Sequence, residues 1–197
     1  MPSDDGRQTS FSFTPEMKQQ GFRRNASSAA RLAAVQALYE VDVAGATVEY
    51  VLASFKEQRW ASVQAELETE VTDLKEGGVH LPAPDRRVLP TVVRGVDSHR
   101  SDLDPLISAQ MEAEDAFQQL EAIAKAILRS AAFELAHTPQ VPVGVISADY
   151  VAIANSFFTE KQPALINAVI ESLAGKLRRD VEPAEAPPAP KRDGSAF

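Results

Sequence analysis

The chain has 197 residues, no cysteine and a formal net charge of −8 at pH 7. The length suits one domain or two small packed ones, and the lack of cysteine excludes disulfides and cysteine-ligated metal sites. The net negative charge argues against a protein that coats nucleic acids in general, but it does not exclude a local basic surface. We find no apolar run of the roughly 18 residues that a membrane span needs and no signal-like N-terminus, so we expect a cytoplasmic protein without membrane contact.

Residues 1–24 contain Ser, Gln, Gly, Asp and Pro without sustained apolar periodicity, which predicts a flexible N-terminal arm. Residues 1–31 hold five basic and three acidic side chains, a local balance of +2. Acidic residues gather between positions 66 and 76 instead, so charge is segregated along the chain. We therefore expect any contact with a polyanion to lie near the arm.

The first helix is expected from about residue 25 to residue 45. Leu32, Val35 and Tyr39 recur at helical spacing and fall on one face. Alanine fills most positions between them, and its small side chain favours helix and lets a neighbouring helix approach closely. The arm thus leads directly into a rigid, packed helix.

Further helices follow in chain order. Thr47 is a good N-cap for the second helix. Residues 61–80 are acidic and contain a Gly-Gly pair, which predicts an insertion that is helical in its first half. A third helix is expected to begin near Asp85, and Asp104, followed by proline, to cap a separate short helix that ends at Met111.

Three longer apolar patterns complete the chain. A continuous stripe predicts a helix over residues 120–135, and two more are expected over 143–157 and from about Pro163 onward. Residues 180–197 are rich in proline and alanine, which predicts a disordered tail. The sequence therefore predicts an all-α domain over residues 25–179, with about seven helices.

Catalytic chemistry finds no support in the sequence. His80, His99 and His137 each stand alone, without the spacing of a metal-binding helix, so no metal is expected. No phosphate-binding loop, dinucleotide fingerprint or nucleophile elbow occurs. We expect Arg129 to be exposed and Glu134 to accept hydrogen bonds from a neighbouring helix end. We predict a protein that is not an enzyme and that has no cofactor.

Basic side chains before and within the first helix suggest binding instead. Arg23, Arg24 and Arg31 offer planar, bidentate donors suited to phosphate, although they can also be read as solvated residues of an arm and a helix start. Arginine at a helix N-terminus opposes the macrodipole, which slightly favours a binding role. Tyr39 is either a core residue or an anchor for a protein partner. Asn167 interrupts an apolar face and needs a partner, either backbone or ligand.

Five blocks, in register over about residues 25–179, resemble the NusB transcription antitermination family: AARLAAVQALYEVD, VVRGV, AILRSAAFEL, VPVGVISADYVAIANSFF and LINAVIESLAGKLR. The resemblance implies an all-helical fold of two packed helical subdomains. It also implies binding of the boxA element of ribosomal-RNA transcripts in a heterodimer with the ribosomal protein NusE. That complex would join RNA polymerase with other Nus factors and would carry out no chemistry.

The family pattern assigns site residues position by position. An arginine-rich run usually precedes the first helix and touches RNA. Arg31 keeps the last of those positions, Ser27 and Ser28 stand where arginines are common, and Arg23 and Arg24 lie a turn earlier. This departure weakens the expected RNA site, because affinity for single-stranded RNA depends on phosphate neutralisation.

The resemblance also places Lys161 near the expected RNA edge, with Asn167 retained, and puts Tyr39 nearer the protein partner. The second interpretation is a NusB-like paralogue that acts as a protein-interaction module or homodimer with weakened RNA binding. The net charge of −8 and the serines at arginine positions motivate it. An RNA-modifying enzyme fragment is a distant third.

Overall fold

The computed structural model describes residues 26–56, 84–113, 115–159 and 161–178. Every regular element within these ranges is helical. The elements are α2 (Ala26–Ala44), α3 (Val48–Ser54), α5 (Val88–Ser108), α6 (Ala116–Gln119), α7 (Ala122–His137), α8 (Val143–Phe157) and α9 (Lys161–Leu177). The all-α prediction is confirmed, while the arm, the insertion at 61–80 and the tail lie outside the described residues.

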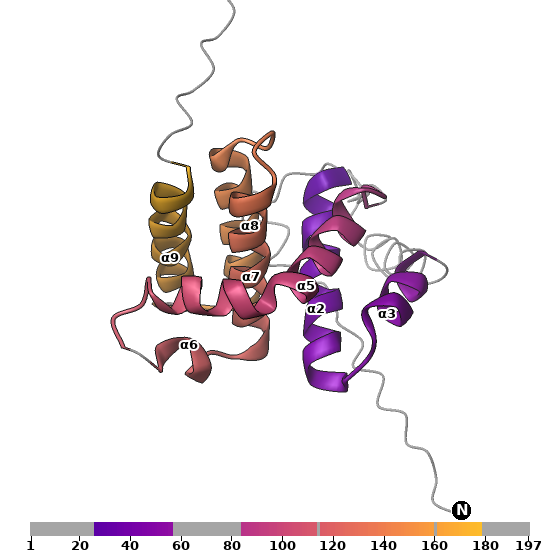
Figure 1. The fold of residues 1–197 in the computed structure, drawn as a ribbon, viewed down its shortest axis with the longest axis horizontal. Helices are drawn as coiled ribbons and strands as arrows, with labels where there is room; N and C mark the ends of the chain where they lie inside the picture. The colour runs from indigo at the N-terminus through magenta and orange to yellow at the C-terminus, as the bar shows by residue number, and fades with distance from the viewer. Residues whose placement is uncertain (1–25, 57–83, 114, 160, 179–197) are drawn as a thin grey trace, which may run out of the picture.

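The helices form two groups that share α7. Helices α7, α8 and α9 stand side by side, α2 lies beside them, and α5 crosses in front (Figure 1). Helix α7 packs against α2 and α5 on one side and against α8 and α9 on the other. Buried apolar residues form one cluster that runs through both groups, so the helices share a common core.

Helix α2 is buried around most of its circumference in its first half. Every residue from Ser28 to Val35 is buried, and four of these eight are alanines. Small side chains allow α5 and α7 to approach the helix closely from both sides. Gly45 ends the helix with a φ of 65°, a left-handed conformation that glycine adopts without strain. Thr47 then caps α3 by accepting a hydrogen bond from the backbone N–H of Tyr50.

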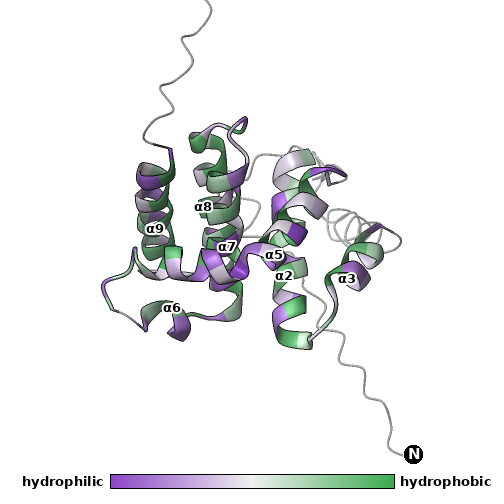
Figure 2. Cartoon of the chain, viewed as in Figure 1, coloured by the Kyte–Doolittle hydropathy of each residue, from purple (hydrophilic) through white to green (hydrophobic). Residues whose placement is uncertain are grey.

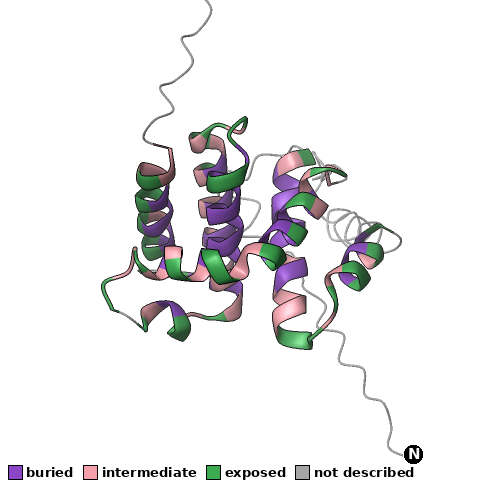
Figure 3. Ribbon diagram, viewed as in Figure 1, coloured by how far each residue is buried: buried purple, intermediate pink, exposed green. Residues whose placement is uncertain are grey.

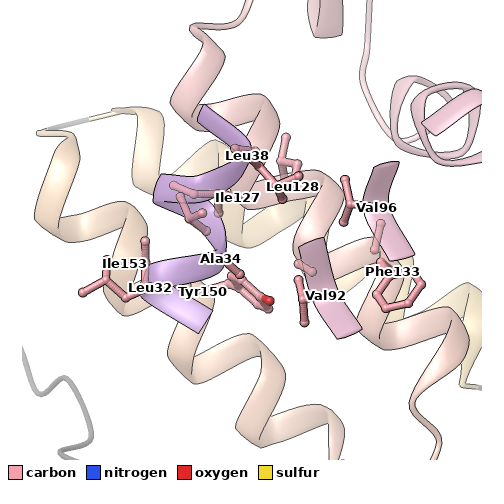
Figure 4. Close-up of a cluster of buried hydrophobic side chains, with 14 of the residues drawn as sticks. Leu32, Ala34, Leu38, Val92, Val96, Ile127, Leu128, Phe133, Tyr150 and Ile153 are labelled. Atoms are coloured by element: carbon pink, nitrogen blue, oxygen red, sulfur yellow. The ribbon is translucent and has the colours of Figure 1, made fainter. Parts of the chain in front are cut away.

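The core is centred on α7, which is buried along most of its length (Figure 3). Figure 2 shows hydrophobic residues concentrated on α7 and α8 and on the side of α9 that faces them. In the close-up of Figure 4, Leu32 and Leu38 of α2 lie against Ile127 and Leu128 of α7, with Ile153 of α8 completing the cluster. The periodicity of the sequence predicted these buried faces.

Helix α5 is continuous, although two separate helices were expected over its length. Asp104 does not cap a new helix, because its carboxylate accepts hydrogen bonds from Arg129 at 2.6 and 2.7 Å. Pro105 lies inside the helix near its end, with the buried residues Leu103 before it and Ile107 after it. Packing of these residues in the core therefore overrides the helix boundary that Asp104 and Pro105 indicated.

Arg129 was predicted to be exposed, and this prediction is wrong, since only 7% of the residue is exposed. Its guanidinium bridges Asp104 of α5 and Asp42 of α2, and Arg100 of α5 also pairs with Asp42. Each carboxylate thus has a cationic partner, which offsets its desolvation. The network ties α2, α5 and α7 together.

Two of the histidines predicted to stand alone are neighbours. The rings of His99 and His137 lie 4.5 Å apart between centroids, and both stack on Phe133. Desolvation and the charge of His99 lower the pKa of His137, against the opposing effect of Asp102. His80 lies outside the described residues. The described part of the chain holds no group of three or more metal-ligating side chains.

The end of α9 caps the end of α7. Arg178, directly after α9, donates hydrogen bonds to the backbone carbonyls of Glu134, Leu135, Thr138 and Pro139. The Glu134 carbonyl also accepts from the backbone N–H and the hydroxyl of Thr138, so Arg178 adds to the existing cap of α7, and a cation there also suits the helix dipole. Among the described residues, no helix is long and apolar enough to cross a membrane.

Candidate nucleic-acid interface at the start of α2

A buried charged cluster fixes the first turns of α2. Only 2% of Arg31 is exposed. Its Nε and Nη2 atoms donate to the two carboxylate oxygens of Glu134 on α7, both at 2.8 Å, and its Nη1 donates to Asp149 on α8 at 3.0 Å. This bidentate geometry is the strongest form of an arginine–carboxylate pair. One side chain therefore joins three helices.

Hydrogen bonds complete the cluster. The Tyr150 hydroxyl donates to Glu134 and the Ser28 hydroxyl donates to Asp149, each at 2.8 Å. Desolvation lowers the pKa of Arg31, but the hydrogen bonds and charge of Glu134 outweigh it, so the pKa is raised overall. Burial and the same carboxylate raise the pKa of Tyr150 well above its usual value. Arg31 stays charged and Tyr150 stays neutral at physiological pH.

This placement corrects the assignment of Arg31 to RNA. A guanidinium that is almost fully buried and bound to two carboxylates has no surface to offer a phosphate. Its role is to position the start of α2, where the arm joins the domain. Glu134, predicted to accept hydrogen bonds from a neighbouring helix, does so from Arg31. The alanine pairs on either side of Arg31 and Leu32 were the available signal, since apart from Arg31 this stretch offers no polar side chain for a solvent-facing side.

The starts of α2 and α5 lie against each other. The backbone N–H of Asp85 donates to the carbonyl of Ala26 at 2.9 Å. The Asp85 carboxylate accepts the backbone N–H groups of Arg87 and Val88, at 2.8 and 3.3 Å, and so caps α5. Arg86 and Arg87 are exposed beside this junction. Sequence reasoning missed both arginines, because only the folded chain brings them next to the arm's attachment point.

Lys161 lies far from that junction. Its neighbour Gln162 bonds Glu121, which directly precedes α7, whereas Arg31 bonds Glu134 near the end of α7. The 13 intervening steps of helix correspond to about 20 Å. Figure 1 shows the same separation, since α2 begins at the upper end of the bundle and α9 at the lower end. The predicted RNA-binding residues therefore do not form one cluster.

The two remaining site residues occupy intermediate positions. Asn167 is partly exposed on α9 and donates to the carboxylate of Glu171 one turn later, at 2.9 Å. Its partner is thus a nearby side chain. Tyr39 is partly buried and packs against the core, in keeping with the first of its two interpretations. Arg23 and Arg24 lie outside the described residues.

Comparison with known proteins decides the family. The model described as "NusB family" matches residues 28–175, from the first buried turn of α2 into α9. The chain belongs to the NusB family. A NusB relative from Bradyrhizobium sp. (strain BTAi1), named transcription antitermination protein NusB, is 39% identical over 158 residues, which cover 80% of this chain and 86% of the relative.

Other similar proteins agree. A protein of the same name from Bartonella tribocorum is 38% identical over 165 residues, covering 83% of this chain and 98% of the relative. Among solved structures, NusB of T. maritima superposes with a TM-score of 0.56 at 19% identity, covering 78% of this chain and 94% of that one. This likeness extends the NusB assignment to the fold as a whole.

Proposed function

We propose that this chain is a non-enzymatic transcription antitermination factor that binds boxA-type RNA of ribosomal-RNA transcripts together with NusE. The observation that carries the proposal is the 39% identity, over 80% of the chain, to a protein named transcription antitermination protein NusB. Family membership over residues 28–175 supports it. RNA polymerase with other Nus factors is the assembly that this complex would join, in the cytoplasm.

The proposed RNA contact begins in the arm. Arg23 and Arg24 directly precede α2, and guanidinium groups suit phosphate in a bidentate manner. The buried Arg31 cluster supports this role indirectly, because it holds the first turn of α2 rigidly to α7 and α8. Because Arg23 and Arg24 precede the fixed start of α2 by only three and two residues, covalent geometry keeps both guanidinium groups near that start.

Lys161 and Asn167 are assigned to a second, separate contact. The separation of about 20 Å along α7 from the α2 start means that only an extended strand would reach both. Lys161 is exposed at the start of α9, so its ammonium is accessible to a phosphate. Asn167 would have to exchange its bond with Glu171 for one to a base or sugar. We place Tyr39 and the neighbouring surface of α2 nearer NusE.

The decisive experiment is a titration of labelled boxA-type RNA with the protein, with and without NusE. A scrambled RNA of equal length and composition is the control. We expect boxA-type RNA to bind more tightly than the control, and NusE to increase that difference. Equal binding of both RNAs in the presence of NusE would contradict the proposal. If sedimentation then showed a homodimer, the alternative interpretation as an interaction module would replace it.

A further inference from the structure

The arginines of the described residues divide into two groups. Five of the seven are engaged within the protein, by carboxylates or by backbone carbonyls: Arg31, Arg94, Arg100, Arg129 and Arg178. Arg86 and Arg87 are exposed, and neither side chain has an ion pair or hydrogen bond within the described part of the chain. As far as the described residues show, these two guanidinium groups are therefore available to a partner from outside.

The position of this pair is set by backbone contacts. The Asp85–Ala26 hydrogen bond of 2.9 Å holds the residue before Arg86 against the first residue of α2. Arg23 and Arg24 precede Ala26 by three and two residues, so covalent geometry keeps them within about 11 Å of it. The structure thus places Arg86 and Arg87 at the end of α2 to which the arm is attached.

Local electrostatics strengthen this basic surface. The starts of α2 and α5 meet here, and each helix N-terminus carries a partial positive charge. The nearest carboxylate on the same turn, that of Asp85, is already bound to the backbone N–H groups of Arg87 and Val88. Arginines at such a position oppose the helix dipole, so they do not serve the stability of α5.

We propose that Arg86 and Arg87 bind RNA phosphates and extend onto α5 the contact that the arm begins. This inference rests on the proposed function and adds residues to its RNA site. RNA carries a phosphate at every nucleotide, so guanidinium groups from two different segments can each bind one without a fixed spacing between the arginines. An acidic peptide would have to place its carboxylates to match both segments, and RNA is therefore the better fit.

The test uses the full chain with Arg86→Gln, Arg87→Gln and the double variant. The probes are labelled boxA-type RNA and an oligouridine of the same length, titrated over a range of salt concentrations. Each lost phosphate contact should reduce the slope of log K against log salt by about 0.7. The double variant should therefore bind about 25-fold more weakly at ~0.1 M salt, on both RNAs.

The matched control is Arg94→Gln, which removes the same charge from an exposed arginine on α5 that is paired with Glu49. We expect its affinity and salt slope to equal those of the wild type. All variants should keep the wild-type circular dichroism spectrum and melting temperature, because Arg86, Arg87 and Arg94 are exposed.

The outcomes separate this inference from the proposed function. An unchanged salt slope in the double variant, with a wild type that binds RNA, would overturn the inference alone, as would an equal loss in Arg94→Gln. If the wild type binds both RNAs equally while the double variant is weakened, the phosphate contact stands and the boxA assignment fails. A labelled polyglutamate peptide is titrated as a third probe, and a loss of binding in the double variant that is confined to this peptide would identify an acidic protein partner and overturn the inference. A wild type that binds neither RNA would contradict both.

Discussion

Two arginine–carboxylate pairs show how burial decides what a single residue does. Arg31 and Glu134 are each 2% exposed, whereas Arg94 and Glu49, with similar bond lengths, are 56% and 70% exposed. An exposed pair is screened by water and contributes little to stability. A buried pair that loses one partner leaves an uncompensated charge in the core, at a large cost. The same residue type is thus structural in α2 and nearly neutral on α5.

We expect Arg31→Met to lower the free energy of unfolding by about 3–5 kcal/mol, because Glu134 and Asp149 would remain buried without their cation. Urea denaturation monitored by circular dichroism measures this change. The matched control, Arg94→Met, should leave stability almost unaltered. A loss below about 1 kcal/mol for Arg31→Met would mean that the cluster contributes no more than a surface pair.

The residue scale is where sequence reasoning was least complete. The arginine content near the N-terminus was visible, but whether Arg31 points outward depends on helices α7 and α8, more than 100 positions away in the chain. Arg129 was misjudged for the same reason, since Asp42 and Asp104 approach it only in the folded state. An ion pair between residues far apart in the chain produces no local sequence pattern, so the burial of these arginines could not be predicted.

At the scale of helices, α5 and α7 are held together by a close approach at one glycine. A Cβ on Gly95 would overlap the ring of Phe133, which is itself 5% exposed. The ring therefore packs directly on the α5 backbone and continues into the stack with His99 and His137. Such a contact tolerates no added methyl group without repacking.

Gly95→Ala is accordingly expected to destabilise the protein by about 1–3 kcal/mol through overpacking. Gly175→Ala on α9 is the matched control, because a Cβ there would meet nothing within 4 Å. That control should stabilise the helix by about 0.5–1 kcal/mol. Thermal unfolding of the two variants gives the comparison, and a shift in the same direction for both would refute the packing argument. Adding Phe133→Leu to Gly95→Ala should recover part of the loss.

Helix positions were largely predictable from periodicity. The expected range 143–157 matches α8, and Gly45 and Thr47 mark the end of α2 and the cap of α3 as predicted. The exceptions are α5, where a proline was read as a helix start, and the short α6, which the sequence did not predict. Capping residues and prolines locate a helix boundary only where core packing does not hold the helix together across it. Here the buried residues of α5, which extend to Ile107, keep the helix continuous.

For the whole molecule, recognition and stability are assigned to different parts of the chain. The described helices share one core, and the proposed RNA contacts in the arm, Arg23 and Arg24, precede it. The family could be inferred from sequence because its blocks are largely core faces, whose apolar spacing is visible in the chain. The proposed RNA site could not be located in the same way, because the proposal combines exposed charges from separate segments.

We expect Arg23→Gln with Arg24→Gln to weaken binding of boxA-type RNA and to reduce the salt slope by up to about 1.4. The melting temperature should stay at the wild-type value. Lys191→Gln with Arg192→Gln is the matched control, since it removes the same charge from the opposite end of the chain. Fluorescence titration and differential scanning calorimetry provide the two measurements. Equal weakening by both pairs would indicate a response to net charge alone.

The contact between Arg178 and the end of α7 bears on how the domain is delimited. The family match stops at residue 175, three positions before this side chain. A fragment cut at that limit would remove the donor that Arg178 supplies to the Leu135 carbonyl and one of the donors to the Glu134 carbonyl. The C-terminal end of α7, which holds Arg31 through Glu134, would then fray more easily, and this would loosen the start of α2. The working boundary of the domain therefore lies after Arg178.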